Sequence, residues 1–373
     1  MAHRWTLVSQ NERYRMTLPK SNRFVLVTGA TGFIGRHVVG RLLSAGRPVV
    51  VTARACAGVS AKERISRIFG SLAGRLTGIV EVDLGDLRSV QDQFHALHSD
   101  IGTVIYCAGE TSFFPDSTAA ARAVQIDVPL ALLDLLQARG LRCWAHVSTA
   151  FVCGQRSGII YEEEGDVGQT FHNPYEGIKL ESERQVAQAC RNLGVDCKIF
   201  RPSIVVGTAP ATEGGKPSNL FLEFVRILTA VARLAGSQAI RIQGRPDAHF
   251  QIVPVEYVAA AIVQITHCPA GSGTYHLVVS NPPTQTEFLD MLTRHLGVCG
   301  ARVLEERALS NPSPLEARLA RMLTLYRKYL TQDVLFDDTC ARQWLDRSGI
   351  SAPRIDTAEI ARLVRLAAPD QSG

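Results

Sequence analysis

The sequence predicts an α/β protein, with a doubly wound parallel sheet followed by a smaller, mostly helical lobe toward the C-terminus. From residue 24 to about 205, apolar segments of strand length alternate with amphipathic segments of helical length, the order that βαβ units require. A glycine-rich turn joins the first strand to the first helix. The chain has 373 residues and 46% hydrophobic content, which is enough for one large domain or two closely packed ones.

The first strand, turn and helix occupy residues 24–39, with the sequence FVLVTGATGFIGRHVV. Gly29 allows a tight turn, Gly32 lets the backbone approach a pyrophosphate, and Gly35 permits close packing of the helix. The helix N-terminus then faces the phosphate charge. The spacing is G-x-x-G-x-x-G, and its place between a strand and a helix predicts a dinucleotide site in a Rossmann-type sheet.

The second strand, residues 49–53, is followed by Arg54 and carries no acidic residue. An NAD enzyme usually places a carboxylate there to hold the ribose 2′-hydroxyl, whereas a guanidinium pairs with the 2′-phosphate of NADPH. We therefore expect NADPH, with Lys62 or Arg64 as additional partners. The alternative is that Arg54 is an ordinary surface arginine. Farther along, Asp86 is expected to cap the next helix.

Two later segments carry the groups that suit carbonyl reduction. In residues 173–179, NPYEGIK, Tyr175 and Lys179 lie four apart, so both project from one face of a helix. An ammonium near a phenol lowers the phenol pKa from its usual value of about 10 and prepares a general acid. Upstream, a strand ends in the hydroxyls of Ser148 and Thr149, which are either turn residues or catalytic groups.

Taken together, these motifs resemble the extended branch of the short-chain dehydrogenase/reductase superfamily. The segments VSTAFV, NPYEGIKLESE, FRPSIVVG and YHLV are similar to the thioester-reductase and fatty acyl-CoA reductase group, the male-sterility-type NAD-binding proteins. The resemblance covers roughly residues 24–290, with weaker similarity at Tyr329–Leu330 and Phe336–Asp337. It implies NADPH-dependent reduction of an acyl thioester, on coenzyme A or an acyl or peptidyl carrier protein, to an aldehyde and in some members on to an alcohol.

The resemblance also implies roles for individual residues. Thr149 takes the place of the catalytic serine or threonine, with Ser148 as the neighbouring candidate. Tyr175 is the general acid, and Lys179 tunes Tyr175 and holds the nicotinamide ribose. Asp83 resembles the adenine contact. The full set of expected cofactor contacts is Gly29, Thr31, Gly32, Phe33, Ile34, Gly35, Arg54, Asp83, Leu84, Cys107, Ala108, Gly109, Tyr175, Lys179, Pro202, Ser203 and Ile204.

The chain departs from the group's pattern at several positions. Asp127 stands where the family often has an asparagine, and a carboxylate cannot donate the hydrogen bonds of an amide. The family's His-x-Ala-Ala segment is Tyr-Cys-Ala-Gly at 106–109, and Ile178 replaces the serine before the lysine. These changes bear on an asparagine-supported proton relay and on the placement of substrate or cofactor.

The expected domain organisation follows from the same landmarks. We expect an N-terminal extension at 1–22, an NADP-binding Rossmann domain at 23–207 with a return segment near 238–265, and a substrate-binding lobe formed by 208–237 and 266–373. Residues 208–219 have the composition of a loop that covers an active site. An apolar helix from 220 forms either an acyl-pocket wall or ordinary core. An amphipathic helix at 313–330 either packs internally or contacts a carrier protein or membrane surface.

The charge and cysteine content of the chain limit the kinds of ligand and partner that we expect. The net charge of +5 is spread along the chain, which argues against nucleic acid and is compatible with phosphorylated coenzymes or an acidic carrier protein. The nine cysteines are scattered, so we expect free thiols, no metal site and a cytoplasmic enzyme. No transmembrane segment is expected. The sequence leaves open whether the apolar helices close a pocket or form a homodimer.

Three other functions remain as alternatives. The first is an NADP-dependent carbonyl or alcohol oxidoreductase acting on a free ketone, aldehyde or hydroxy compound, as in the steroid- and flavonoid-type relatives. The second is a sugar-nucleotide epimerase or dehydratase, against which Arg54 argues because those enzymes retain NAD. The third is a non-catalytic NADPH-binding protein, which the intact set of Thr149, Tyr175 and Lys179 makes the weakest reading.

Overall fold

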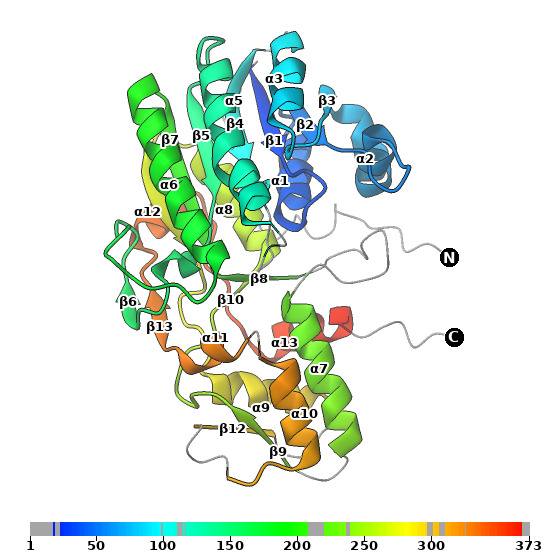
Figure 1. Ribbon diagram of the computed structural model, residues 1–373, viewed down its shortest axis with the longest axis vertical. Coiled ribbons are helices and arrows are strands. Elements are labelled where there is room, and N and C mark those ends of the chain that lie inside the picture. The colour runs from blue at the N-terminus through cyan, green and yellow to red at the C-terminus, as the bar shows by residue number, and fades with distance from the viewer. Residues whose placement is uncertain are drawn as a thin grey trace.

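The fold is that of a computed structural model that describes residues 18, 23–97, 100–109, 115, 117–207, 220–235, 239–296, 301–305, 310–324 and 326–367. The predicted N-terminal extension, Leu18 apart, and the predicted loop at 208–219 lie outside these residues. The described chain forms a large domain around a parallel sheet and a smaller lobe beside the carboxyl ends of its strands (Figure 1).

The central sheet has seven strands, and every pairing in it is parallel. In spatial order the strands are β11 (Gly273–Leu277), β7 (Asp196–Pro202), β5 (Cys143–Val147), β4 (Ile101–Tyr106), β1 (Phe24–Thr28), β2 (Val49–Ala53) and β3 (Gly78–Glu81). The apolar sequences of β1 and β2 are typical of strands covered on both faces. The strand order reverses between β1 and β4, and such a switch point is where ligands bind in doubly wound sheets. The predicted fold class is confirmed.

Helices cover both faces of the sheet (Figure 1). On one face, α1 (Phe33–Ser44) packs against α8 (Val255–His267). On the other face, α5 (Val128–Gln137) lies between α3 (Leu87–Ala96) and α6 (Pro174–Leu193). The remaining helical segments of this domain are α2 (Ala61–Phe69), η2 (Gly70–Arg75), α4 (Thr118–Arg122), the π-helical turn η3 (Ala123–Asp127) and the 3₁₀ turn η4 (Ala150–Cys153).

Polar side chains cap the N-termini of several of these helices, and the cap predicted at Asp86 is among them. The Asp86 carboxylate accepts hydrogen bonds from the backbone N–H groups of Arg88 and Ser89 at the start of α3. Asn173 caps α6 in the same way, and Pro174 takes the first helical position, where a missing N–H costs nothing. The cap therefore fixes where the helix that carries Tyr175 begins.

The smaller lobe combines helices with a short two-stranded sheet. Its elements are α7 (Leu220–Ala235), β9 (Ile240–Gln243), α9 (Gln285–Leu296), β12 (Ala301–Leu304), α10 (Pro314–Met322), α11 (Arg327–Thr331) and α13 (Thr357–Ala367). From α7, Phe224 packs against Phe250, Phe288 and Tyr326, with ring centroids 5.5–6.5 Å apart. This side of α7 therefore belongs to the core, as the packing alternative expects.

The structure extends the predicted return to the large domain. β11 lies at the edge of the central sheet beside β7, and α12 (Thr339–Arg347) packs on β11 and α8. Within the predicted return segment, β9 instead pairs with β12 in the lobe. The predicted helix at 313–330 is interrupted after Met322. Two further short sheets pair β8 (Ile204–Val206) with β10 (Ile252–Pro254) and β6 (Gly158–Ile160) with β13 (Val334–Phe336).

Three properties of the described residues bear on function. None of their helices combines the length and apolar character needed to cross a bilayer. Among the same residues, no cluster of His, Cys, Asp and Glu is arranged to hold a metal ion. Each cysteine in this part of the chain is a free thiol.

Candidate functional site

A cleft of about 530 Å³ opens at the carboxyl ends of β1, β2 and β4. It is lined by nine of the residues predicted to contact the cofactor, namely Gly29, Thr31, Gly32, Arg54, Asp83, Leu84, Cys107, Ala108 and Gly109. A further wall, formed by Ser117, Ala120, Ala121 and Val124, is absent from the prediction. Its small side chains carry no sequence signal of their own. The other predicted cofactor contacts lie outside this lining.

The glycine turn has the geometry that its spacing predicts. Gly29 has a φ of +65°, and a Cβ there would lie 2.8 Å from the backbone of Cys107 and Ala108. A Cβ on Gly35 would lie 2.2 Å from the Gly29 carbonyl oxygen. Arg36 fixes the turn by donating hydrogen bonds to the carbonyls of Thr31 at 2.8 Å and Gly32 at 3.0 Å. The first helix therefore begins tightly against the strand, with no side chain capping its N-terminus.

The far side of the cleft carries the group expected to choose the cofactor. The Arg54 guanidinium lies 3.4 Å from the Asp83 carboxylate, and both side chains are more than half exposed. Arg64 donates a hydrogen bond to the Arg54 carbonyl at 2.7 Å. Because the ion pair is exposed, it contributes little to folding and leaves the guanidinium accessible to an anion.

At the other end of the site, α6 carries Tyr175 and Lys179. The Lys179 ammonium is buried and donates a hydrogen bond to the Val147 carbonyl, 2.9 Å away at the end of β5. Burial lowers the pKa of Lys179 to about 8, while the Glu183 carboxylate and the Cys107 thiol oppose the shift. This contact joins α6 to the strand that precedes Ser148 and Thr149.

The expected lowering of the tyrosine pKa is wrong for this structure. Burial raises the pKa of Tyr175 above its ordinary value, and the Glu176 carboxylate raises it further. The spacing of Tyr175 and Lys179 predicts a shared face but not the surroundings of the phenol, which belongs to a half-buried residue. Desolvation is the main cause of the shift and the charge of Glu176 the second, so the raised pKa favours the protonated phenol.

The two candidate hydroxyls at the end of β5 differ in their surroundings. Thr149 Oγ1 accepts a hydrogen bond from the Phe151 N–H at 3.3 Å and so caps the following turn. Its O–H can still donate to a substrate oxygen. Among the described residues, Ser148 Oγ is buried without a hydrogen-bond partner, and so is Ser203 Oγ. Buried hydroxyls are usually paired, so these two are suited to receive polar groups of a ligand.

Asp127, which stands where the resembling family often has an asparagine, ends the π-helical turn η3. Asp127 is exposed, so its side chain points away from any buried relay. Gln125 is buried instead, and a Cβ on Gly109 at the cleft would lie 2.7 Å from its amide nitrogen. The Gln125 carbonyl accepts a hydrogen bond from Ser182 on α6. A π-helical residue shifts the helix register, which sequence spacing does not show.

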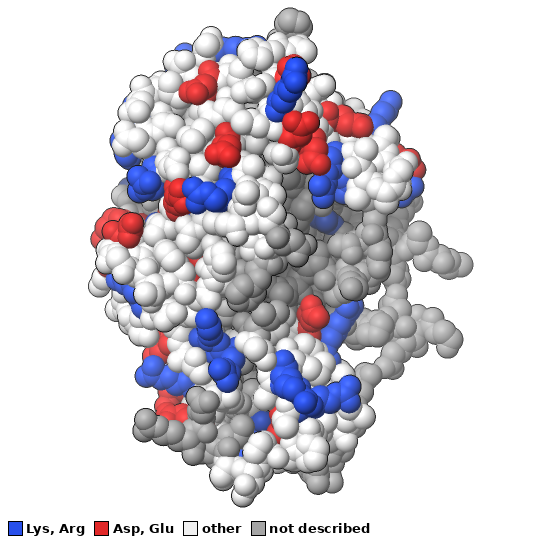
Figure 2. Space-filling model, in the orientation of Figure 1, with Lys and Arg blue, Asp and Glu red and all other residues white. Residues whose placement is uncertain are grey.

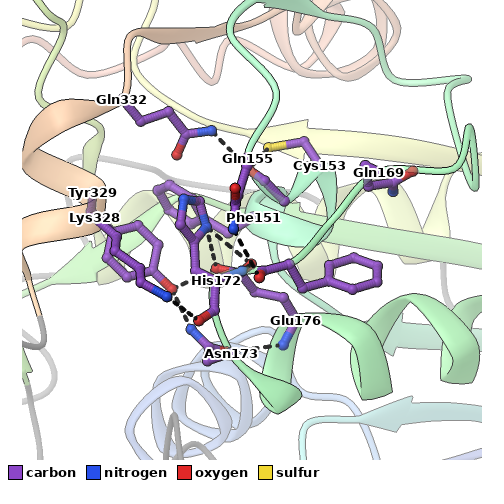
Figure 3. A network of polar contacts seen from close by, with 12 residues as sticks. Phe151, Cys153, Gln155, Gln169, His172, Asn173, Glu176, Lys328, Tyr329 and Gln332 are labelled. Atoms are coloured by element: carbon purple, nitrogen blue, oxygen red, sulfur yellow. Dashed lines mark hydrogen bonds and ion pairs between the residues drawn. The ribbon is translucent and has the colours of Figure 1, made fainter.

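A second group of polar residues surrounds the start of α6 (Figure 3). Glu176, directly after Tyr175, is fully buried and accepts a hydrogen bond from the Tyr329 hydroxyl at 2.5 Å. His172 and Asn173 belong to the same network. The sequence predicted none of these as site residues. The similarity noted at Tyr329–Leu330 is the one signal that could have pointed to them.

Comparison with known proteins assigns the chain to a family. The NAD-binding family described as Male sterility protein matches residues 27–262, well over half of the chain. The chain belongs to the Male sterility protein family. The predicted resemblance is thereby confirmed.

Two curated relatives agree with membership of the Male sterility protein family. A hybrid PKS-NRPS synthetase from Thermothelomyces thermophilus is 29% identical over 66% of this chain. A carboxylic acid reductase from Segniliparus rugosus is 25% identical over 72% of it. The chain spans only 6% and 25% of the lengths of these two proteins. The NAD-binding family match and the reductase name of the second relative agree with the expected enzyme class, a nicotinamide-dependent oxidoreductase of the short-chain dehydrogenase/reductase type.

Solved structures share the fold. The terminal R domain of the myxalamid PKS-NRPS pathway matches with a TM-score of 0.73 at 22% identity, covering 96% of each chain. A thiolation-reductase di-domain from an archaeal non-ribosomal peptide synthetase gives 0.74 at 18% identity, covering 96% of this chain and 78% of that one. UDP-glucuronic acid 4-epimerase from Bacillus cereus, in complex with NAD, gives 0.65 at 18% identity, covering 92% and 98%. The fold and family together indicate a nicotinamide cofactor.

Proposed function

We propose that this protein uses NADPH to reduce an acyl thioester to an aldehyde. The observation that carries the proposal is the junction between α6 and β5, where Lys179 binds the Val147 carbonyl and brings the catalytic helix to the hydroxyls of Ser148 and Thr149. The glycine-turn cleft of the same domain supplies the cofactor site. The PKS-NRPS and carboxylic acid reductase relatives support a thioester substrate.

The residues of the cleft fit NADPH. The three glycines let backbone segments of the turn approach one another closely, and Gly29 and Gly32 line the cleft without side chains. The N-terminus of α1 has no side-chain cap, so its free N–H groups suit a pyrophosphate. Arg54 suits the 2′-phosphate, because a guanidinium pairs with phosphate oxygens in a two-pronged contact. The unpaired hydroxyl of Ser203 suits a polar group near the nicotinamide. When bound, NADPH supplies the hydride that adds to the thioester carbon.

Side chains of the protein then bind and protonate the carbonyl oxygen of the thioester. In the proposed reaction, Thr149 and Tyr175 donate hydrogen bonds to this oxygen and stabilise the charge that develops on it. Tyr175 gives its proton to the oxygen, and Lys179 supplies positive charge nearby and binds the nicotinamide ribose. The resulting hemithioacetal expels the thiol and leaves the aldehyde. A second round of reduction would give an alcohol.

A carrier protein is the proposed source of the thioester. Figure 2 shows Lys and Arg side chains gathered on the visible face of the smaller lobe. On α10 and α11, Arg318, Arg321 and Arg327 are exposed. Such a surface attracts an acidic partner through complementary charge. The thiolation-reductase di-domain, a structure with the same fold, agrees with this partner.

The proposal is tested by following NADPH absorbance with a series of acyl-CoA thioesters, a carrier-bound thioester and the matching free aldehydes. NADH serves as the cofactor control. Thioester-dependent oxidation with a preference for NADPH supports the proposal. Oxidation with free aldehydes or ketones alone would assign the protein to the carbonyl-reductase alternative. Tight binding of NADPH without turnover of any substrate would indicate the non-catalytic alternative.

A further inference from the structure

The start of the catalytic helix is held by a segment that follows it by about 150 residues in sequence. Tyr329 on α11 donates its hydroxyl hydrogen to Glu176 Oε1 at 2.5 Å and accepts from Asn173 Nδ2 at 2.7 Å, across sequence separations of 153 and 156 residues. Lys328 Nζ donates to the His172 carbonyl at 3.0 Å. Figure 3 shows these side chains converging from α11 and from the turn before α6.

Glu176 depends on these partners because its carboxylate has no access to water. One oxygen accepts from Tyr329, and the other accepts from the His172 backbone N–H at 2.9 Å. The His172 ring nitrogen Nδ1 lies 3.1 Å from the second oxygen. A buried carboxylate that loses a donor is costly. The His172 ring nitrogen also lies 3.2 Å from the oxygen that Tyr329 bonds, and Asn173 caps the helix from the backbone side. Tyr329 therefore adds a hydroxyl donor from a distant segment to the contacts that hold Glu176 and the first turn of α6.

The same segment also holds the loop that follows Thr149. The Tyr329 ring packs edge-on against Phe151, with centroids 5.1 Å apart. Phe151 is the residue whose N–H binds Thr149 Oγ1. Beyond α11, Gln332 donates from Nε2 to the Gly154 carbonyl at 2.7 Å. One short segment of the smaller lobe therefore contacts both the start of α6, which carries Tyr175, and the turn that follows Thr149.

We infer that Tyr329 is a positioning residue which, through Glu176 and Phe151, sets Tyr175 and Thr149 in their working geometry when α11 is seated against α6. Tyr175 directly precedes Glu176, so a displaced first turn moves the phenol directly. The catalytic part of this inference rests on the proposed function. Its structural part does not, because the contacts exist whatever the substrate is. A lobe that moves on binding a partner would thereby alter the catalytic geometry.

The test compares Y329F with T331V. Y329F removes only the hydroxyl and keeps the ring against Phe151. T331V removes a hydroxyl from the same helix, and among the described residues that hydroxyl bonds only to carbonyls within α11. Hydrogen–deuterium exchange of peptides covering 172–178 should be faster in Y329F than in wild type and unchanged in T331V. With an active thioester substrate, kcat should fall about tenfold or more in Y329F, at an unchanged Kd for NADPH.

The outcomes separate the two proposals. Unchanged exchange at 172–178 in Y329F would overturn the inference, as would wild-type kcat in that variant. An equal loss of kcat and NADPH affinity, with a lowered Tm, would also overturn it, because a general loss of stability predicts that pattern. If wild-type protein reduces no thioester while Y329F still speeds exchange at 172–178, the proposed function fails and the structural role of Tyr329 stands.

A second variant checks the hydrogen-bonding logic. Both carboxylate oxygens of Glu176 act as acceptors, whereas a glutamine offers one acceptor and one donor group. In E176Q the amide oxygen can accept from the His172 N–H only if the amide N–H₂ faces Tyr329. The Tyr329 hydroxyl can accept from that group but loses Glu176 as the acceptor for its own hydrogen. We expect E176Q to speed exchange at 172–178 relative to wild type, because the Tyr329 hydroxyl loses its carboxylate acceptor. Wild-type exchange in E176Q would contradict the role given to the carboxylate.

Discussion

The Lys179 ammonium donates a hydrogen bond to the Val147 carbonyl at 2.9 Å. This contact spans 32 residues of sequence and joins the helix that carries Tyr175 to the strand that leads to Thr149. A lysine at this place is held by the backbone of its own domain before any ligand binds. The geometry of the proposed catalytic end is therefore built into the fold.

Removal of the phenol should stop the reaction. We expect Y175F to lower kcat by about a hundred- to ten-thousandfold, the usual contribution of a positioned general acid, while the Kd for NADPH stays close to wild type. Steady-state rates and a fluorescence titration with NADPH measure the two quantities. The partly exposed Tyr161 lies in a loop outside the cleft lining, and Y161F is the matched control. Near-normal turnover in Y175F would remove Tyr175 from the mechanism.

The rate should fall as the pH rises through about 8. Burial lowers the pKa of Lys179 to about 8, so above that pH the ammonium loses its proton and its positive charge no longer supports the developing oxyanion. The pH profile of kcat/KM measures this. K179R, which stays charged, should shift the fall to higher pH. A profile that stays level well above pH 8 in wild type would contradict the role of this charge.

The lowered pKa of Lys179 also predicts how stability changes with pH, and here the change is a rise where the rate falls. Its pKa is lower in the folded chain than in the unfolded chain, so between about pH 8 and the ordinary lysine pKa the unfolded chain binds more protons. The contribution of Lys179 to the free energy of unfolding should therefore rise with pH across that window. Denaturant unfolding of wild type and K179M at several pH values measures it, because K179M lacks this contribution. Identical pH slopes in the two proteins would argue against the lowered pKa.

Arg54 should decide between the two nicotinamide cofactors. R54A should raise the KM for NADPH by about ten- to a hundredfold, since hydrogen bonds to a charged group are strong, and leave the KM for NADH nearly unchanged. D83N is the companion variant, because it removes the charge that faces Arg54 at 3.4 Å while keeping an oxygen for the adenine. It should leave the KM for NADPH unchanged or lower it. Equal losses with both cofactors in R54A would point to a structural role.

The tight packing of the glycine turn predicts that alanine at Gly35 destabilises the protein and alanine at Gly74 does not. A Cβ in G35A would lie 2.2 Å from the Gly29 carbonyl oxygen, whereas a Cβ at Gly74 would meet nothing within 4 Å. G35A should therefore lower the free energy of unfolding by about 1–3 kcal/mol or more and weaken NADPH binding, and G74A should do neither. Thermal unfolding and cofactor titration of the two variants measure this. A G35A protein as stable as G74A would show that the turn can relax.

The parts of the site that were predictable are those with local spacing. The glycines of the turn, the cap at Asp86 and the four-residue interval from Tyr175 to Lys179 depend on neighbouring residues in the chain. The surroundings of the half-buried Tyr175 depend on tertiary packing and on the neighbouring Glu176 charge. The direction of its pKa shift was therefore predicted wrongly. In the same way, the π-helical turn that buries Gln125 and exposes Asp127 changes the helix register without a sequence pattern.

The unpredicted parts are contacts between distant segments. Tyr329 and Glu176 are 153 residues apart, and no local sequence pattern predicts that they meet. β11 joins the central sheet after the chain has already formed part of the smaller lobe, and its five residues carry too little pattern to show which sheet they join. Sequence periodicity indicates that a strand exists, whereas its partner is set by tertiary packing.

The most direct test of the proposed function is the ratio of thiol released to NADPH oxidised when the protein is given an acyl-CoA thioester. Free coenzyme A is measured with a thiol reagent while NADPH is followed by absorbance in the same sample. Reduction to an aldehyde predicts one thiol for each NADPH, and continued reduction to an alcohol predicts one thiol for every two. NADPH oxidation without release of thiol would contradict thioester reduction and leave a reductase of some other group.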